Sequence, residues 1–352
     1  MTTTNAVRLR RPAPQVLAGS REAVDPALRA AAGTLPGSMR RIVGYHLGWN
    51  DEHGRPTAGA AGAGGKAIRP ALVLLAAEAA GGCAESALPA AVAVELVHNF
   101  SLLHDDVMDG DLTRRHRPTA WSVFGRNPAI LAGDALLTLA FDVLAGSGHP
   151  AAGPAARMLG AAVQDLVDGQ SADMVFENRT DVGLPECMRM ARLKTGALFG
   201  CACATGAAFG GGGPDTVERL RGFGERLGLV FQLVDDLLGI WGDPDATGKP
   251  AFSDLHNRKK SLPVVAALAS GSPAGRELAE LYHRAQPLSA VDVVRAADLV
   301  DAAGGRTWVR ATTGEMLADA LRQLPDTAAG GPAGCAVAEL AALARLIASR
   351  DR

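Results

Sequence analysis

Two aspartate pairs lie far apart in the chain but in matching apolar surroundings. On facing helices they would form one oxygen-rich cage. Such cages suit Mg²⁺, a hard ion that usually binds a couple of carboxylates together with substrate phosphates. We therefore expect a diphosphate substrate. The pairs, each with the residue that closes its motif, are Asp105-Asp106 with Asp109 and Asp235-Asp236 with Gly239.

Acidic residues on a helix more often form a solvated face than a metal site. Here the aspartates interrupt two strongly apolar stretches, from Val92 to Leu103 and from Leu227 to Ile240. A buried carboxylate without a cationic neighbour is costly in such surroundings. The setting therefore favours a functional role for both pairs.

The first pair lies at the end of an expected helix from Pro89 to Asp109. Asp105 and Asp109 would lie one turn apart on one face of this helix, with His98 two turns before Asp105 on the same face. The helix would thus present a possible cation beside its own metal site. The alternative for His98 is a core histidine with a satisfied hydrogen bond.

A run of cationic or potentially cationic residues, Arg114 to Arg117, follows the first motif. Guanidinium groups match phosphate oxygens two at a time, so paired arginines beside a metal site indicate a second anionic group. Charge at the end of a helix would explain any one of these residues but not the whole run. Weaker candidates further along are Gln170, Asp173, Lys194 and Thr195. The stretch around the second pair is more distinctive, because Lys249 and the run from Arg258 to Lys260 follow that pair within one connection.

The order of these motifs, from Ala61 to Leu268, resembles the trans-type polyprenyl synthetase family, the isoprenyl diphosphate synthases. The resemblance implies the helical isoprenoid synthase fold and a homodimer. It also implies condensation of isopentenyl diphosphate with an allylic diphosphate, assisted by about three Mg²⁺ ions per site.

The resemblance also assigns roles to residues. The isopentenyl diphosphate pocket would be Lys66, Arg69, His98 and Arg115. Asp105, Asp109 and Asp173 would bind two Mg²⁺ ions, and Asp235 would bind a third. The catalytic residues would be Asp105, Asp106, Asp109, Lys194 and Asp235. The allylic diphosphate contacts would be Arg114, Gln170, Lys194, Lys249 and Lys259, and Thr195, Phe231 and Gln232 would flank the growing carbocation.

Two positions depart from the family pattern. Gly239 stands where a third aspartate is usual, and Phe252 stands where a glycine is common. Asp243, one turn after Gly239, is a possible substitute for the missing carboxylate. The departures predict weaker metal binding without excluding activity.

The composition favours a helical protein. Only 4% of the 352 residues are aromatic, while 48% are hydrophobic, with long Ala and Leu runs at helical spacing. We predict an all-α, single-domain bundle of roughly ten or more helices around a central cavity, spanning residues 21–352. Residues 1–20 show no sustained period and predict a disordered tail.

Charge and cysteine content narrow the class further. The 35 basic and 37 acidic residues leave no global field for nucleic acid. Five cysteines without a CxxC pair indicate core residues in a reducing compartment. No stretch has the length and uniform hydrophobicity of a membrane span, so the sequence predicts a soluble cytoplasmic protein without a membrane partner.

Other interpretations stay open at this stage. A terpene cyclase shares the metal clamp but has no use for a second diphosphate pocket, and a non-catalytic partner subunit would explain Gly239 and Phe252. Two segments, from Gly64 to Lys66 and from Gly239 to Asp243, are also similar in sequence to polyprenyl transferases carried as cargo in encapsulin-type protein shells. In those proteins a disordered leader docks to the shell, whereas here plain disorder of the tail is the alternative.

Phe100 is the candidate for setting product length. It lies five residues before Asp105, which is about 7.5 Å along a helix axis. A bulky ring there would act as a floor for the hydrocarbon tail. This arrangement resembles family members that stop at the twenty-carbon geranylgeranyl product. The alternative is an ordinary core residue that faces another helix.

Overall fold

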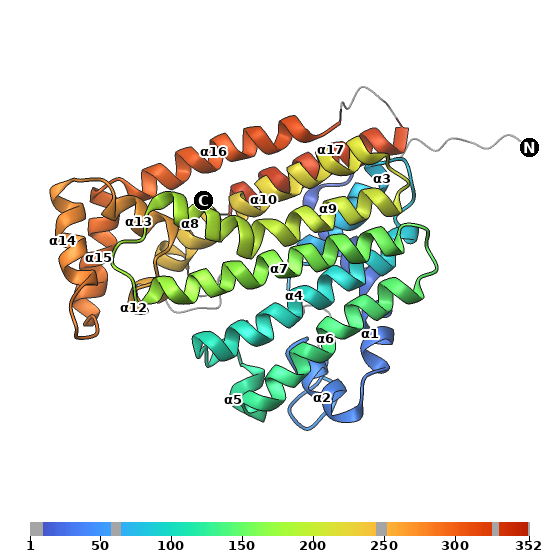
Figure 1. The fold of residues 1–352 in the computed structure, drawn as a ribbon, viewed down its shortest axis with the longest axis horizontal. Helices are drawn as coiled ribbons and strands as arrows, with labels where there is room; N and C mark the ends of the chain where they lie inside the picture. The colour runs from blue at the N-terminus through green and yellow to red at the C-terminus, as the bar shows by residue number, and fades with distance from the viewer. Residues whose placement is uncertain (1–9, 58–64, 244–251, 326–330, 351–352) are drawn as a thin grey trace, which may run out of the picture. The chain divides into compact units, whose positions relative to one another are not determined.

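The protein is helical throughout the residues that its computed structural model describes, which are 10–57, 65–243, 252–325 and 331–350. Figure 1 shows the helices and the connections between them. The only strands within these ranges form one short hairpin, in which β1 (Thr113–Arg114) pairs with β2 (Arg117–Pro118). The all-α fold class is therefore confirmed.

The chain forms two compact units, each built from several segments. The first unit comprises residues 1–161, 199–224 and 323–343, and the second comprises residues 162–198, 225–322 and 344–352. The chain passes from one to the other after residues 161, 198, 224, 322 and 343, so no single linker divides it. The single domain that we expected from the sequence stays a prediction.

In the first unit, helix α4 is the central element. It packs against α6, α3 and α1, and its apolar residues are buried from Ala90 to Val97. The helices of this unit and the parts of longer helices that join it are α1 (Ala13–Gly33), α2 (Gly37–His46), α3 (Ile68–Ala79), η2 (Glu85–Ala87), α4 (Leu88–Asp109), α5 (Ala120–Phe124), α6 (Arg126–Gly146), the start of α7 (Ala152–Glu177), most of α9 (Ala197–Phe209), the start of α10 (Pro214–Trp241) and most of α17 (Gly331–Ala348).

Helices α3 and α9 approach each other unusually closely. A Cβ atom on Gly206 would lie 2.2 Å from the Val73 carbonyl oxygen, and one on Gly210 would lie 2.3 Å from that of Ala77. Only glycine fits at these two positions, because the atoms in the way are backbone atoms. The spacing of four residues on each side places both contacts on one face of each helix.

The N-terminal boundary differs from the prediction. Helix α1 begins at Ala13, inside the expected tail of residues 1–20, and buries Val16, Ser20, Val24 and Leu28 at helical spacing. Arg11 lies just before it and forms two hydrogen bonds of 2.6 and 3.2 Å with the Oε2 atom of Glu339, which is fully buried in α17. The apolar residues of this helix do follow a helical period in the sequence, but the arginines and prolines around them obscured it. Residues 1–9 lie outside the described ranges.

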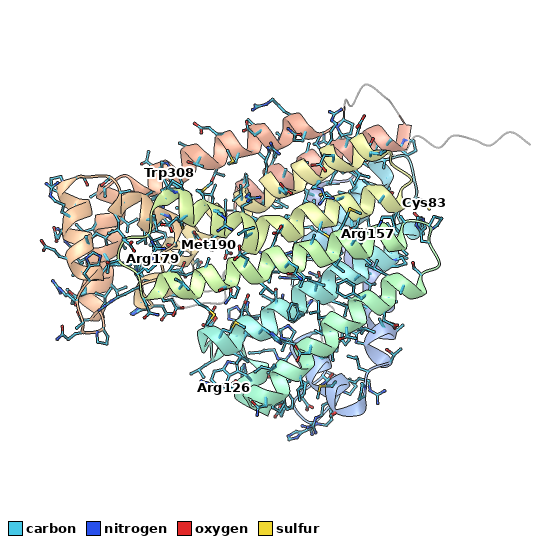
Figure 2. All side chains as sticks on the ribbon, in the orientation of Figure 1. Cys83, Arg126, Arg157, Arg179, Met190 and Trp308 are labelled. Atoms are coloured by element: carbon cyan, nitrogen blue, oxygen red, sulfur yellow. The ribbon has the colours of Figure 1, made fainter. Side chains whose placement is uncertain are left out.

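The second unit is organised around two apolar clusters. One gathers Leu229, Leu233 and Leu237 of α10 with Cys187 and Met190 of α8, and Trp308 packs against it; Figure 2 labels Met190 and Trp308. The other joins the paired helices α14 and α15, which lie side by side in Figure 1. The elements of this unit that have not yet been introduced are α8 (Leu184–Ala191), η3 (Arg192–Gly196), α12 (Ser253–His256), α13 (Leu262–Leu268), α14 (Pro273–Tyr282), α15 (Ala290–Ala302) and α16 (Gly305–Gln323).

Three helical segments have the length and composition of a membrane span, contrary to the sequence prediction that none would. They are Glu85–Asp109, Arg126–Gly146 and Gly331–Ala348. In the first, 72% of the apolar window is buried inside the protein. The hydrophobic residues of this segment thus belong to the core around α4. The sequence prediction missed the segment because polar residues such as Glu95 and Asn99 lie between its apolar residues.

Candidate active site

The first acidic motif lies in the last turns of α4, which ends at Gly110 with a positive φ of 70°. Asp105 is half-buried and Asp109 is exposed, one turn apart as predicted. Asp106, in contrast, is only 1% exposed. The motif therefore divides into two accessible carboxylates and one structural carboxylate.

Asp106 holds the hairpin that follows the helix. Its Oδ1 atom lies 2.7 Å from both Nε and Nη2 of Arg114. Burial raises the pKa of Asp106 to about 6, although Arg114 opposes this shift. Arg114, expected to contact the allylic diphosphate, is thus held by a carboxylate of the protein's own first motif. The remaining oxygen of Asp106 has no hydrogen-bond partner among the described residues.

The predicted isopentenyl diphosphate residues lie in the first unit. Lys66 is exposed just before α3, and the guanidinium of Arg69 lies 4.7 Å from the ring centre of Phe199. Arg115 lies close to Gly65, whose Cβ would be 2.6 Å from the Arg115 Nη2 atom. Three of the four predicted residues are thus positioned by α3 and the hairpin, while His98 belongs to α4.

His98 is not the cation that the sequence suggested. Burial lowers its pKa well below the usual value, and the charges of Arg69 and Arg115 lower it further. Burial also lowers the pKa of His46, at the end of α2, to about 3, and the charges of Arg115 and Arg114 add to this effect. Both imidazoles are therefore neutral, and the positive charge of this region comes from arginine and lysine.

In the second unit, Asp173 of α7 lies between two lysines. The Lys194 Nζ atom donates a 2.6 Å hydrogen bond to the Asp173 Oδ2 atom, and the Lys259 Nζ atom lies 3.9 Å away. Burial alone would raise the pKa of Asp173, but Lys259 and Lys194 bring it below the ordinary value. Asp173 is therefore ionised, with its charge shared between two cations.

Lys194 and Thr195 lie in η3, a turn of π-helix between α8 and α9. Such turns are rare and are frequent at functional sites. This one crosses α7 closely, since a Cβ on Gly169 would lie 2.4 Å from the backbone nitrogen of Lys194. Gly169 therefore allows the turn to approach α7, where Asp173 receives Lys194 and where Gln170 is buried.

A chain of hydrogen bonds links this turn to the second acidic motif. The Thr195 hydroxyl donates to the Gln232 Oε1 atom at 2.7 Å, and the Gln232 amide donates to the Asp236 Oδ1 atom at 2.7 Å. The backbone N–H of Leu262 donates to the other Asp236 oxygen at 2.8 Å. Burial raises the pKa of Asp236 to about 7. Asp236 is thus structural, like Asp106, whereas Asp235 is exposed.

The two departures from the family pattern have physical explanations. A Cβ on Gly239 would lie 2.4 Å from the Asp254 Oδ2 atom, so the missing side chain makes room for a carboxylate from another part of the chain. Asp243 lies beyond the end of α10 and is exposed. Phe252 has a φ of 60°, in the left-handed region that favours glycine. This conformation explains why a glycine is common at that position.

The remaining predicted residues are less distinctive. Phe231 is half-buried, with the Arg350 guanidinium 5.2 Å from its ring centre. Phe100 is buried, with its ring 4.8 Å from that of His104, which in turn contacts the Ile130 carbonyl oxygen of α6. Lys249 lies outside the described residues. Across the described ranges, no three His, Cys, Asp or Glu side chains gather as a ready metal site, so the predicted cage stays a prediction.

Sequence reasoning missed several polar residues of these sites. They are Arg21, His46, Glu95, Asn99 and Asp254. Glu95 could have been found, because it interrupts an apolar stretch just as the aspartates do. Asn99 lies one turn after Glu95 on the same helix, whereas Arg21, His46 and Asp254 come from segments whose proximity no local pattern encodes.

Comparison with known proteins agrees with this geometry. The family model of the polyprenyl synthetases matches residues 53–299. The chain belongs to the polyprenyl synthetase family. It is 50% identical over 299 residues to a (2E,6E)-farnesyl diphosphate synthase of Mycobacterium tuberculosis, covering 84% of this chain and 82% of that protein. It is 46% identical over 337 residues to a geranylgeranyl diphosphate synthase of the same organism, covering 96% and 93%.

Solved structures of the family share the fold. A polyprenyl synthetase from Streptomyces coelicolor has a TM-score of 0.87 at 45% identity, with 95% of this chain and 98% of that one covered. A geranylgeranyl pyrophosphate synthase from Corynebacterium glutamicum, solved with isoprenyl diphosphate and magnesium, has a TM-score of 0.76 at 26% identity, with 96% and 98% covered. This polyprenyl synthetase is therefore an enzyme, a prenyltransferase that elongates prenyl diphosphates, and the cyclase and non-catalytic interpretations have no support.

Proposed function

We propose that this polyprenyl synthetase condenses isopentenyl diphosphate with an allylic diphosphate and releases geranylgeranyl diphosphate. The observation that carries the proposal is the presence of two kinds of anion-binding group. Arg69 and Arg115 are half-buried beside the exposed Lys66, whereas Lys194 and Lys259 accompany the acidic residue Asp173. A homoallylic diphosphate needs only cations, while a leaving diphosphate needs cations and metal together.

The donor set fits magnesium. The proposed ligands Asp105, Asp109, Asp173 and Asp235 offer only hard carboxylate oxygens, which Mg²⁺ prefers. About three Mg²⁺ ions held by these residues would neutralise the charge that develops on the leaving diphosphate. The relative from Corynebacterium glutamicum binds magnesium with its diphosphate ligand, which supports this assignment.

The side chains of the protein would supply the rest of the reaction. Lys194 and Lys259 would stabilise the departing diphosphate, with Arg114, Gln170 and Lys249 as further contacts. Thr195, Gln232 and Phe231 would line the path of the allylic carbocation, and an apolar surrounding would exclude water that could trap it. We propose that Asp254, beside Gly239, supplies the carboxylate that the family pattern has at residue 239.

The oligomeric state and location are also proposals. A homodimer agrees with the resemblance, and Ile130 and Leu131 of α6 are 37% and 56% exposed, which offers apolar surface to a second copy. We place the protein in the cytoplasm. Docking of the N-terminal segment to an encapsulin-type shell would be tested by co-expression with a shell protein, where failure to co-purify would reject it.

The product assay tests the proposed function. The purified protein is incubated with isopentenyl diphosphate, each allylic primer in turn and Mg²⁺, and product chain length is measured. The twenty-carbon product is expected. A fifteen-carbon product is the competing outcome, since the farnesyl diphosphate synthase is 50% identical. Absence of any condensation would overturn the proposal.

Phe100→Ala tests the proposed floor in the same assay. The substitution deepens the cavity and leaves the diphosphate contacts untouched, so longer products should form. Unchanged product length in a stable, active variant would show that Phe100, packed on His104, only fills the core.

A further inference from the structure

Glu95 is a buried carboxylate that no assigned role explains. It lies in α4, one turn before His98, and is only 7% exposed. The Asn99 side chain, one turn further on, donates to the Glu95 carbonyl oxygen at 2.8 Å and to its Oε1 atom at 3.1 Å. An amide thus holds the carboxylate in one orientation. A carboxylate at such depth is retained only where cations compensate for its burial.

The cations that act on Glu95 come from three separate elements. Burial raises the pKa of Glu95, and the charges of Arg69, Arg115 and Arg21 oppose that shift. Arg69 belongs to the first turn of α3, Arg115 to the β1–β2 hairpin and Arg21 to α1. Glu95 is therefore near enough to three arginines from separate elements for their charges to act on it.

The arginines also fix the loop before α3. Arg21 donates a hydrogen bond to the Gly65 carbonyl oxygen. The Arg115 guanidinium occupies the space beside Gly65, where a Cβ would lie 2.6 Å from its Nη2 atom. Gly65 has a φ of 87° and Ala67 one of 50°, so the backbone around Lys66 adopts conformations that need such support. Arg21 and Arg115, whose charges act on Glu95, thus also hold the residue that precedes Lys66.

We propose that Glu95 is a positioning residue that holds Arg69 and Arg115 in the orientation that binds the diphosphate of isopentenyl diphosphate. The inference rests on the proposed assignment of that pocket. Without Glu95, the guanidinium groups of Arg69 and Arg115 lose the negative charge that offsets their mutual repulsion, so their forks no longer converge on one diphosphate. Asn99 acts through Glu95 in the same way.

The test compares Glu95→Gln with Glu339→Gln. Glu339 is a matched control, because it is a fully buried glutamate of the same unit held by an arginine, Arg11. Each variant is assayed for the KM of isopentenyl diphosphate, the KM of the allylic primer, kcat and thermal midpoint. Both substitutions should lower the thermal midpoint. Glu95→Gln alone should raise the KM of isopentenyl diphosphate about tenfold, with the primer KM changed by less than about twofold.

The outcomes separate the possible errors. An unchanged or lowered KM for isopentenyl diphosphate in Glu95→Gln would overturn the inference, and so would an equal rise for both substrates. A wild-type protein that consumes no isopentenyl diphosphate would instead overturn the proposed function.

Calorimetric titration with isopentenyl diphosphate alone, without primer, provides a readout that does not depend on turnover. Glu95→Asp keeps the charge and should recover part of the affinity that Glu95→Gln loses. If Glu95→Gln does not fold, Asn99→Ala replaces it, since it leaves the carboxylate in place but releases its orientation. Wild-type affinity in Asn99→Ala would then reject the positioning role.

Discussion

Gly239 lies one turn after Asp235 on α10, and the carboxylate of Asp254 fills the space beside it. A missing aspartate in the motif is thus accompanied by a carboxylate from α12, the next described helix along the chain. The exchange explains how the second motif can keep its acidic character.

Gly239→Ala tests this arrangement. The new Cβ would lie 2.4 Å from the Asp254 Oδ2 atom and displace the carboxylate, so catalytic efficiency at limiting Mg²⁺ should fall about tenfold. The substitution should not weaken α10 itself, because the helix propensity of alanine exceeds that of glycine by about 1 kcal/mol. Asp254→Asn should give a similar loss. Normal Mg²⁺ dependence in both variants would show that Asp254 has no part in the site.

Among the elements, the π-helical turn η3 depends on a glycine of another helix. Gly169 of α7 faces the backbone of Lys194, and no side-chain movement can relieve a Cβ at 2.4 Å. Gly169→Ala should therefore destabilise the protein by about 1–3 kcal/mol and move Lys194 from Asp173. Urea denaturation and kcat provide the two measurements.

Gly160→Ala is the control on the same helix. Its Cβ would approach only Phe141, at 4.0 Å, so it should leave kcat unchanged and stabilise α7 by up to about 1 kcal/mol. Equal behaviour of the two variants would contradict a specific role for Gly169.

The sequence predicted elements and motifs better than their contacts. Apolar helical periods gave the fold class, and the acidic motif on α4 gave Asp105 and Asp109 their shared face. In each motif one aspartate is accessible, Asp105 or Asp235, and the next is buried, Asp106 or Asp236. This difference could not be predicted from the sequence. It depends on Arg114 and on the backbone of Leu262, which only the folded chain brings near.

For the whole molecule, the N-terminal segment is part of the folded protein from Ala13 onwards. Deleting residues 1–20 would remove Arg11, leave Glu339 buried without its partner and cut α1. We therefore expect this deletion to destabilise the protein by several kcal/mol, because breaking a buried pair typically costs about 3–5 kcal/mol. The thermal midpoint and yield of soluble protein are the measurements.

Deleting residues 1–9 keeps Arg11 and is the matched control. Its thermal midpoint should equal that of the full chain. A deletion of residues 1–20 that is as stable as this control would show that the contact between Arg11 and Glu339 contributes nothing to the fold.

The central proposal is that each acidic motif takes part in the metal-assisted reaction. Asp105→Asn and Asp235→Asn test it most directly, each with an exposed aspartate of the same unit as control, Asp142→Asn and Asp298→Asn. With isopentenyl diphosphate, an allylic primer and saturating Mg²⁺, each motif variant should lose about 10³-fold in turnover at an unchanged thermal midpoint, while both controls keep the wild-type rate. Near-normal turnover in Asp105→Asn or in Asp235→Asn would contradict the claim.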